Sequence, residues 1–282
     1  MRSILLAALV VGLSAGAVRA ADEPRHEFDV PYGDDELQRI DIYLPKPGGG
    51  PRPAVVWVHG GGFREGDKRQ GPNSISVLSN LLVAKGFVAF SVNYRLMPKH
   101  VHPTQVDDVQ RAIRWIRSSA EKYQVDPNRI GAVGISAGGH LVAMLAARET
   151  RAKQNDILDA FSSRVQAAVA INGPMDLRSS AETTTILTNV VNKFTGGDAG
   201  QAADASPLTF VDKSTSPILF IVGDRDTLIP NSHSTRMAEA MNAAGSHAET
   251  LVIAGGGHAI FPSITPRARD ACLDFFVKQL KP

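Results

Sequence analysis

The sequence predicts an α/β fold in which a mostly parallel, eight-stranded sheet is covered by helices on both faces. Short continuous apolar runs recur from about residue 27 onward, and such runs fill strands that are buried on both sides. Helix-like segments separate most of these runs, so successive strands need crossover connections. With 282 residues and 43% hydrophobic residues, the chain can bury one large core, which predicts a single domain over residues 21–282.

Each apolar run predicts one strand. HEFDV and QRIDIYL predict the first two, joined through a turn at residues 33–35. The six later runs have the continuous apolar character of strands in a buried parallel sheet. The predicted strands are 26–30, 38–44, 54–58, 87–92, 129–135, 165–171, 217–223 and 248–254.

Helices are expected between and after the later strands. The first has Asn73 as its predicted N-cap and stops at Gly86. The predicted helices are 74–85, 106 to about 123, 231–244 and 266–280. The least regular stretch, 176–213, predicts a short helix and loops, enough for a small lid but not for a separate domain.

Residues 1–20 have the features of a secretory signal peptide. A basic residue is followed by an apolar stretch, and the small residues Ala20 and Val18 stand at the last and third-last positions before the expected cut. The apolar stretch is shorter than the ~20 residues that a membrane-spanning helix needs. The sequence therefore predicts a secreted or periplasmic protein without a membrane anchor.

The charge balance gives no reason to expect an acidic partner. The chain has 30 Lys and Arg against 28 Asp and Glu, and removal of Arg2 and Arg19 with the signal peptide leaves 28 against 28. A neutral mature chain predicts neither nucleic acid nor an acidic membrane as partner. Cys272 is the only cysteine, so no intrachain disulfide can form, and a buried structural thiol is expected there.

The stretch AVVWVHGGGFREGDK, residues 54–68, ends a predicted strand in three consecutive glycines. Glycine contributes no side-chain contacts, so such a run marks either a tight turn or backbone that approaches a ligand closely. In a parallel sheet, ligands bind at the carboxyl ends of the strands. The run follows such an end and is expected to lie at the ligand-facing edge.

A second motif, GISAG at residues 134–138, leads from a predicted strand directly into a predicted helix. This is G-x-S-x-G in the strand-to-helix context, where flanking glycines let helix and strand pass closely and push the serine hydroxyl into the cleft. The competing interpretation is a serine that only caps the helix. The context favours Ser136 as a nucleophile.

A serine hydroxyl needs a base, and the base needs a carboxylate that orients it. His258 lies in a glycine-rich loop after the last predicted strand and is the predicted base, with an exposed loop histidine as the competing interpretation. Asp226, a few residues beyond the preceding strand, is the predicted acid, whereas Asp224 is expected to cap the turn. Asp176, which follows the strand at 165–171, is an alternative acid.

The glycine run is expected to supply hydrogen-bond donors to the reacting substrate. A tetrahedral intermediate carries an oxyanion, which needs preorganised N–H donors. The predicted donors are the backbone N–H groups of Gly61 and Gly62 together with that of Ala137, directly after the serine. His59 is expected to brace this loop rather than act on substrate.

Six ordered motifs resemble the α/β-hydrolase fold: HGGGF (59–63), NYRLMP (93–98), QRAIRWIR (110–117), GISAGGH (134–140), GDRDTLIP (223–230) and GGGHAIF (255–261). Within that fold, the chain resembles the exported carboxylesterases of the hormone-sensitive-lipase-like and the bacterial feruloyl/acetyl-xylan-esterase-like groups. The chain order Ser136, Asp226, His258 is the order of this fold. The resemblance also implies that residues 94–96, with Asp108, form a scaffold near the site.

Two departures favour the second group, which implies an open cleft and small acyl groups. Ile135 stands before the serine, where hormone-sensitive-lipase-like enzymes usually carry a carboxylate. A mature chain that begins at Ala21 is too short for their helical N-terminal cap.

The sequence thus predicts a secreted serine esterase for short-chain carboxylic esters, with acetyl or feruloyl esters of plant polysaccharides as candidates. Phe63, Leu96 and Met97 are the predicted acyl-pocket walls, and no metal or other cofactor is expected because His100 and His102 lack a third ligand at useful spacing. The alternatives are a small-molecule amidase or peptidase with the same triad, or a binding protein that inherited the fold.

Overall fold

One eight-stranded sheet runs through the structure, in the order β1-β2-β4-β3-β5-β6-β7-β8. The structure is a computed structural model that describes residues 25–69, 75–149, 156–178, 184–261 and 265–281. The predicted signal peptide and the predicted cap Asn73 lie outside these residues. The strands are β1 (Arg25–Pro31), β2 (Arg39–Leu44), β3 (Arg52–Val58), β4 (Val88–Val92), β5 (Val125–Ile135), β6 (Ala167–Ile171), β7 (Ile218–Gly223) and β8 (Ala248–Ile253).

The sheet is mostly parallel, as predicted. Only β2 pairs antiparallel with its neighbours β1 and β4, and the six strands from β4 to β8 along the sheet pair in parallel. Val58 at the end of β3 lies opposite Gly134 near the end of β5. The carboxyl ends of the central strands therefore share one edge, at which the predicted site residues follow β3, β5, β7 and β8.

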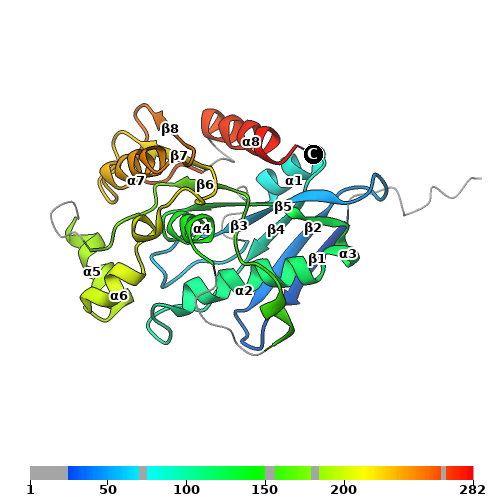
Figure 1. Cartoon of the computed structure of the whole chain (residues 1–282), viewed down its shortest axis with the longest axis horizontal. Coiled ribbons are helices and arrows are strands. Elements are labelled where there is room, and N and C mark those ends of the chain that lie inside the picture. Colours follow the sequence, from blue (N-terminus) through cyan, green and yellow to red (C-terminus); the bar gives the residue numbers. More distant parts are fainter. Residues whose placement is uncertain (1–24, 70–74, 150–155, 179–183, 262–264, 282) are drawn as a thin grey trace, which may run out of the picture.

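Helices cover both faces of this sheet (Figure 1). One face packs on α1 (Ile75–Ala84) and α8 (Pro266–Leu280), and the other on α2 (Thr104–Ser118), α4 (Ala137–Ala147) and α7 (Ser232–Ala243). Successive residues of each strand enter opposite cores, because side chains alternate along a strand. In β3, Val56 belongs to the core under α2 and α4, and Val55 to the core under α1 and α8. These two cores confirm the predicted fold class.

The predicted helix from 106 to about 123 is two helices in the structure. After α2 the chain breaks at Ser119 and resumes as the single turn α3 (Ala120–Tyr123). The Trp115 carbonyl accepts both the Ser119 N–H at 3.0 Å and the Ser118 hydroxyl at 2.9 Å at this end of α2. The apolar stripe gives no sign of this break.

The stretch 176–213 is also more helical than predicted. It forms α5 (Thr185–Thr195), α6 (Ala199–Asp204) and the short 3-10 turn η3 (Pro207–Phe210); another such turn, η2 (Ile157–Ala160), precedes β6. Thr184 and Asp198 cap the two helices through their side chains, at 3.1 Å to the Leu187 N–H and 2.7 Å to the Gln201 N–H. Figure 1 shows α5 and α6 together at the side of the molecule remote from β1.

Two smaller expectations concern the surface and the thiol. Cys272 is buried among the residues that pack under α8, and burial raises the pKa of its thiol, as expected for a structural cysteine.

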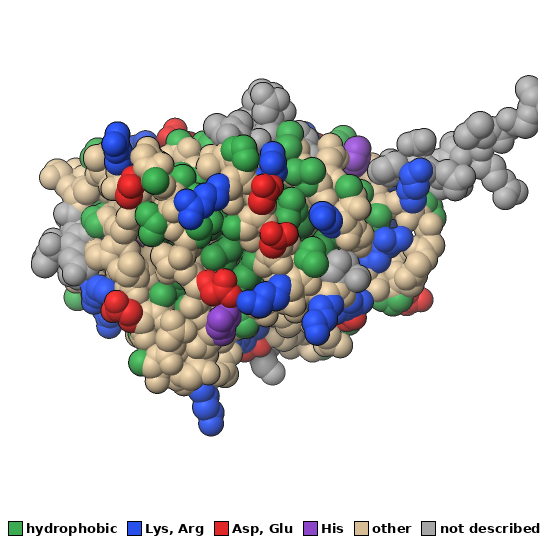
Figure 2. Space-filling view, turned by 90° about the horizontal axis from the view of Figure 1, so that it is seen from above, with side chains coloured by type: hydrophobic (Ala, Val, Ile, Leu, Met, Phe, Trp, Pro, Cys, Tyr) green, Lys and Arg blue, Asp and Glu red, His purple; other side chains and the backbone are tan. Residues whose placement is uncertain are grey.

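On the face in Figure 2, described acidic, basic and apolar side chains are interspersed rather than gathered by charge. Within the described residues, no helix combines the length and the apolarity that a membrane crossing requires.

Candidate active site

Ser136 lies on a strained turn between β5 and α4. Its backbone has φ 56° and ψ −120°, a conformation that a residue with a side chain rarely adopts, and its hydroxyl makes no capping hydrogen bond to α4. The crossing is very tight: a Cβ on Gly138 would lie 2.1 Å from the Val58 carbonyl oxygen, and one on Gly134 would lie 2.4 Å from the Gly138 oxygen. Both glycines of the motif are therefore required for steric reasons, and the helix-cap interpretation of Ser136 has no support.

Ser136, His258 and Asp226 form one chain of hydrogen bonds. His258 Nε2 lies 2.9 Å from Ser136 Oγ, and its Nδ1 lies 2.8 Å from Asp226 Oδ2. The side chain of Asp226 is fully buried, while that of His258 remains 26% exposed to the site. With the Nδ1–H donating to the carboxylate, Nε2 is left as the acceptor that faces the serine hydroxyl.

The second oxygen of Asp226 is held by the backbone. Its Oδ1 accepts the N–H groups of Leu228 at 2.8 Å and Ile229 at 3.0 Å. Burial alone would favour the neutral acid, but the hydrogen bond from His258 and these two N–H groups outweigh it, so the pKa of the Asp226 carboxyl is lowered. A carboxylate fixed in this way keeps its charge and its orientation toward the imidazole.

The other two aspartates have different partners. Asp176, the alternative acid, pairs with Arg178 at 2.8 Å and with Arg236 at 3.2 Å. Asp224 accepts the Gly255 N–H at 2.7 Å, so its carboxylate contacts the loop after β8 rather than a backbone N–H of its own turn. The geometry therefore favours Asp226 as the partner of His258.

The glycine run lies beside Ser136 and has a conformation that requires glycine. Gly61 has φ +108° and a Cβ there would lie 2.0 Å from the Glu65 carbonyl oxygen, while Gly62 has φ +58°. Within the described residues, the backbone N–H groups of Gly61, Gly62 and Ala137 donate to no protein acceptor. Unpaired N–H groups next to a nucleophile can bind an oxyanion.

His59 stabilises the conformation of this loop. Its Nδ1–H donates to the Gly60 carbonyl at 2.7 Å, and its ring stacks on Tyr94 with centroids 4.3 Å apart. The Tyr94 hydroxyl donates in turn to the His59 carbonyl at 3.0 Å. Burial lowers the pKa of His59 to about 4, so the ring is neutral at ordinary pH. These contacts show that His59 has a structural role in the loop, as expected from the sequence.

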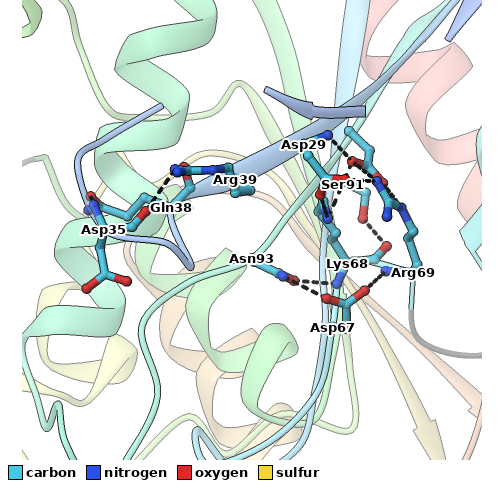
Figure 3. Close-up of polar contacts among 10 residues, drawn as sticks. Asp29, Asp35, Gln38, Arg39, Asp67, Lys68, Arg69, Ser91 and Asn93 are labelled. Carbon is cyan, nitrogen blue, oxygen red and sulfur yellow. Dashed lines mark hydrogen bonds and ion pairs between the residues drawn. The ribbon is translucent and has the colours of Figure 1, made fainter. Parts of the chain in front are cut away.

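The far end of the loop is tied to the sheet by a cluster of charges (Figure 3). Lys68, whose side chain is almost fully buried, donates to Asp29 at 2.5 Å, and Arg69 donates to Asp41 at 2.5 Å. Asn93 donates to Asp67 at 2.7 Å and accepts the Lys68 backbone N–H. Polar contacts thus fix both ends of the glycine loop, buried at His59 and partly buried at Lys68 and Arg69, which preorganises the N–H groups between them.

Two of the three residues predicted to line the acyl pocket lie at cavities beside Ser136. A cavity of about 510 Å³ opens above Ser136 and is lined by Met97, and a smaller apolar cavity of about 70 Å³ is lined by Phe63. Leu96 lines neither of these cavities and packs against the core instead, so the structure does not bring this predicted acyl-pocket residue to the site.

The scaffold implied by residues 94–96 and Asp108 is present. Arg95 donates through Nη2 to Asp108 at 2.6 Å, and its backbone N–H donates to the same carboxylate at 2.8 Å. Gln38 also donates to Asp108, at 2.7 Å. This cluster lies between β2 and α2 and fixes the chain that leads to Met97.

A comparison of the sequence with models of known families gives one match. The BD-FAE model matches residues 40–241, which is 202 of 282 residues and well over half of the chain. The chain belongs to the BD-FAE family. The matched segment contains Gly61, Gly62, Ser136 and Asp226, whereas His258 lies beyond it.

This BD-FAE chain is similar to proteins that are named esterases. It is 34% identical to Esterase LipC of Mycobacterium tuberculosis over 83% of this chain and 59% of LipC, so it spans about three fifths of that relative. It is 28% identical to kynurenine formamidase of Danio rerio, over 86% of this chain and 77% of the relative. A solved structure, a truncated form of a carbohydrate esterase from gut microbiota, has 28% identity, a TM-score of 0.78 and coverage of 93% of this chain and 99% of its own. The resemblance to α/β-hydrolase esterases is confirmed.

Three residues that line the cavities of the BD-FAE chain were not identified from the sequence. Ile186 and Val190 on α5, and Leu228 after β7, line both cavities around Ser136. The segment 185–195 did carry a signal, because its apolar residues recur at helical spacing along one face. Leu187 and Val191 are buried in the core, whereas Ile186 and the partly buried Val190 line both cavities.

Within the part of the chain that the structure describes, no three His, Cys, Asp or Glu side chains are grouped so that they could hold a metal ion. The hydrogen-bonded chain of Ser136, His258 and Asp226 contains the groups that nucleophilic attack and proton transfer need. The arrangement can therefore perform acyl transfer with its own side chains.

Asp226→Asn is expected to lower kcat for an ester by about 10⁴-fold, because an amide no longer holds the imidazole tautomer that accepts the serine proton. Asp176→Asn and Asp224→Asn are matched controls with expected changes of less than about tenfold. The kinetics of the three purified variants test the assignment. A large loss in Asp176→Asn with a nearly intact Asp226→Asn would reverse it.

The free energy of unfolding is expected to fall between pH 7 and pH 5 because of two buried histidines. Burial lowers the pKa of His59 and His140 to about 4, from an ordinary value of 6.5. The unfolded imidazoles therefore bind protons first as the pH falls, so stability is full above pH 6.5 and is lost toward pH 4. The expected loss at pH 5 is on the order of 2 kcal/mol for each histidine.

Urea unfolding at the two pH values measures this loss. His59→Gln should remove its share of the pH dependence, whatever it does to stability at pH 7. Equal stability of the wild type at pH 7 and pH 5 would show that neither imidazole stays neutral in the folded protein.

Proposed function

We propose that this chain is a serine esterase that hydrolyses short-chain carboxylic esters through an acyl-enzyme. The observation that carries the proposal is the chain of hydrogen bonds from Asp226 through His258 to Ser136, next to N–H groups of the glycine loop that have no acceptor among the described residues. Neither feature alone would support catalysis, since a nucleophile needs both a base and a place for the developing charge.

The proposed reaction has two halves. His258 Nε2 takes the proton of Ser136 as Oγ attacks the ester carbonyl, and the N–H groups of Gly61, Gly62 and Ala137 bind the oxyanion. The protonated imidazole, stabilised by the Asp226 carboxylate, gives its proton to the leaving alcohol. His258 then takes a proton from the water that attacks the acyl-enzyme. It gives this proton to Ser136 Oγ as the acyl–Oγ bond breaks and the acid is released.

Carbohydrate esters are the proposed natural substrates. The similarity to a carbohydrate esterase of known structure supports this, and so does the predicted signal peptide, because an exported enzyme meets polymer-derived esters. We propose export to the periplasm or the medium for the same reason. The cavity of about 510 Å³ is large enough for a sugar as the alcohol portion.

A formamidase is the second candidate, favoured by the similarity to kynurenine formamidase. An amide demands stronger protonation of its leaving nitrogen than an ester demands of its oxygen. The test compares p-nitrophenyl acetate and an acetylated xylo-oligosaccharide with N-formylkynurenine, on the full chain and on Ser136→Ala. Faster turnover of the acetyl esters supports the esterase, faster turnover of the formamide supports the second candidate, and no turnover of any of them rejects both.

A further inference from the structure

Ser136 stands at the junction of two cavities of very different size. The larger holds about 510 Å³ and the smaller about 70 Å³. Both are lined by the serine and by the same small group of neighbours, namely Gly62, Ile186, Val190 and Leu228. An ester bound with its carbonyl at Ser136 must therefore place its acyl part in one cavity and its alcohol part in the other.

The position of His258 decides which part goes where. His258 lines the larger cavity and not the smaller one, while Ala137, a predicted oxyanion donor, lines only the smaller. The leaving alcohol takes its proton from His258 Nε2, so its oxygen must lie on the imidazole side of the serine. The alcohol then occupies the larger cavity, and the acyl group is left with the smaller one.

We propose that the 70 Å³ cavity is the acyl subsite and that it admits acetyl and propionyl groups but excludes longer acyl chains and feruloyl groups. The inference rests on the proposed esterase function. An apolar protein cavity of about 150 Å³ holds benzene, which corresponds to roughly 25 Å³ for each carbon atom. A cavity half that size holds about three carbons, and the carbonyl carbon at Ser136 uses one of those places.

The side chains on the far wall of this subsite are closely packed in the core. Phe63 is 2% exposed and stacks on Phe194 with centroids 3.9 Å apart, and Leu187 and Ile229 are also buried in the core. Rearranging such packed side chains to make room is destabilising. Among the described residues that line the subsite, Ser136 has the only polar side chain, so the wall offers nothing to the hydroxyl and methoxy groups of an aromatic acid.

Val190 is the specificity-determining wall on the near side. It projects from α5 over the glycine loop, and both of its methyl groups lie 3.9 Å from the place where a Cβ of Gly62 would be. It lines both cavities, so it forms part of the partition between them. Removing its two methyl groups should join the acyl subsite to the larger cavity and make room for a longer chain. Figure 1 shows that α5 lies outside the central layers, so the change spares the sheet.

The experiment measures kcat/KM of the full chain for the p-nitrophenyl esters of acetate, propionate, butyrate and hexanoate, which share one alcohol. We expect similar values for the first two and a fall of at least a hundredfold by hexanoate. In Val190→Ala we expect the acetate-to-hexanoate ratio to fall at least tenfold. Val191→Ala is the matched control: it removes the same two methyl groups from the same helix, but at a position that packs on the core, and it should keep the wild-type ratio.

Three results would overturn the inference while leaving the esterase standing: hexanoate hydrolysed as well as acetate, methyl ferulate hydrolysed as well as phenyl acetate, or equal ratios in Val190→Ala and Val191→Ala. Absence of hydrolysis of every ester by the folded wild type is a different result. It would reject the proposed function itself, and the acyl subsite with it.

Discussion

Ser136→Ala is expected to lower kcat for p-nitrophenyl acetate by roughly 10⁶-fold, the loss that follows removal of a triad nucleophile. The variant keeps a Cβ on the strained turn and loses only the hydroxyl that faces His258, so the backbone conformation has no reason to change. The free energy of unfolding should stay within about 1 kcal/mol of the wild type. Loss of activity would then reflect chemistry and not folding.

The matched control for this variant is Ser216→Ala. The Ser216 hydroxyl donates to the Val165 carbonyl at 2.6 Å and has no contact with the site, so its removal should leave kcat unchanged. Progress curves at high enzyme concentration are needed to measure the residual rate. If Ser136→Ala kept more than a thousandth of wild-type activity, another group would be the nucleophile.

Gly138→Ala is expected to cost about 3 kcal/mol of stability or more, the upper end of the effect of overpacking. The new Cβ would lie 2.1 Å from the Val58 carbonyl oxygen and 2.6 Å from that of His59. Both atoms are backbone at the end of β3, so α4 must move away from the sheet and take Ser136 with it. Activity should fall together with stability, because the serine hydroxyl leaves its position beside His258.

Urea unfolding of Gly138→Ala measures this cost, with Gly200→Ala as the control. Gly200 lies in α6, where an added Cβ would meet only the side chain of Asp198 at 3.1 Å, and alanine favours the helix. Gly200→Ala should therefore be neutral or slightly stabilising. An unfolding midpoint of Gly138→Ala equal to that of the wild type would show that the helix and strand do not cross as closely as described.

The strands and the hydrogen-bonded chain could be predicted because each depends on local patterns. Continuous apolar runs identify the strands, and the strand-to-helix context of GISAG identifies Ser136. The choice between Asp226 and Asp176 could be proposed but not settled, since it depends on the N–H groups of the turn at Leu228 and on the arginines that surround Asp176.

The acyl side of the site could not be predicted because it is made by contacts between distant segments. Val190 lies next to Gly62, although the two are 128 residues apart in the sequence. No local sequence pattern predicts that contact. Leu96 was placed at the site by its neighbourhood in sequence, yet adjacent residues can face different surroundings: Met97 lines the larger cavity while Leu96 packs against the core. The apolar stripe likewise does not record the break in the helix at Ser119, whose backbone has φ −99° and ψ 10°.

Covalent labelling tests the central claim most directly. The full chain is treated with diisopropyl fluorophosphate, which reacts with an activated serine, and peptide mapping by mass spectrometry locates the adduct. We predict one adduct per chain, on the peptide that contains Ser136, with loss of ester hydrolysis in proportion to labelling and no adduct in His258→Ala. Hydrolysis that continues in the presence of the reagent, or an adduct on any other residue, would contradict the account.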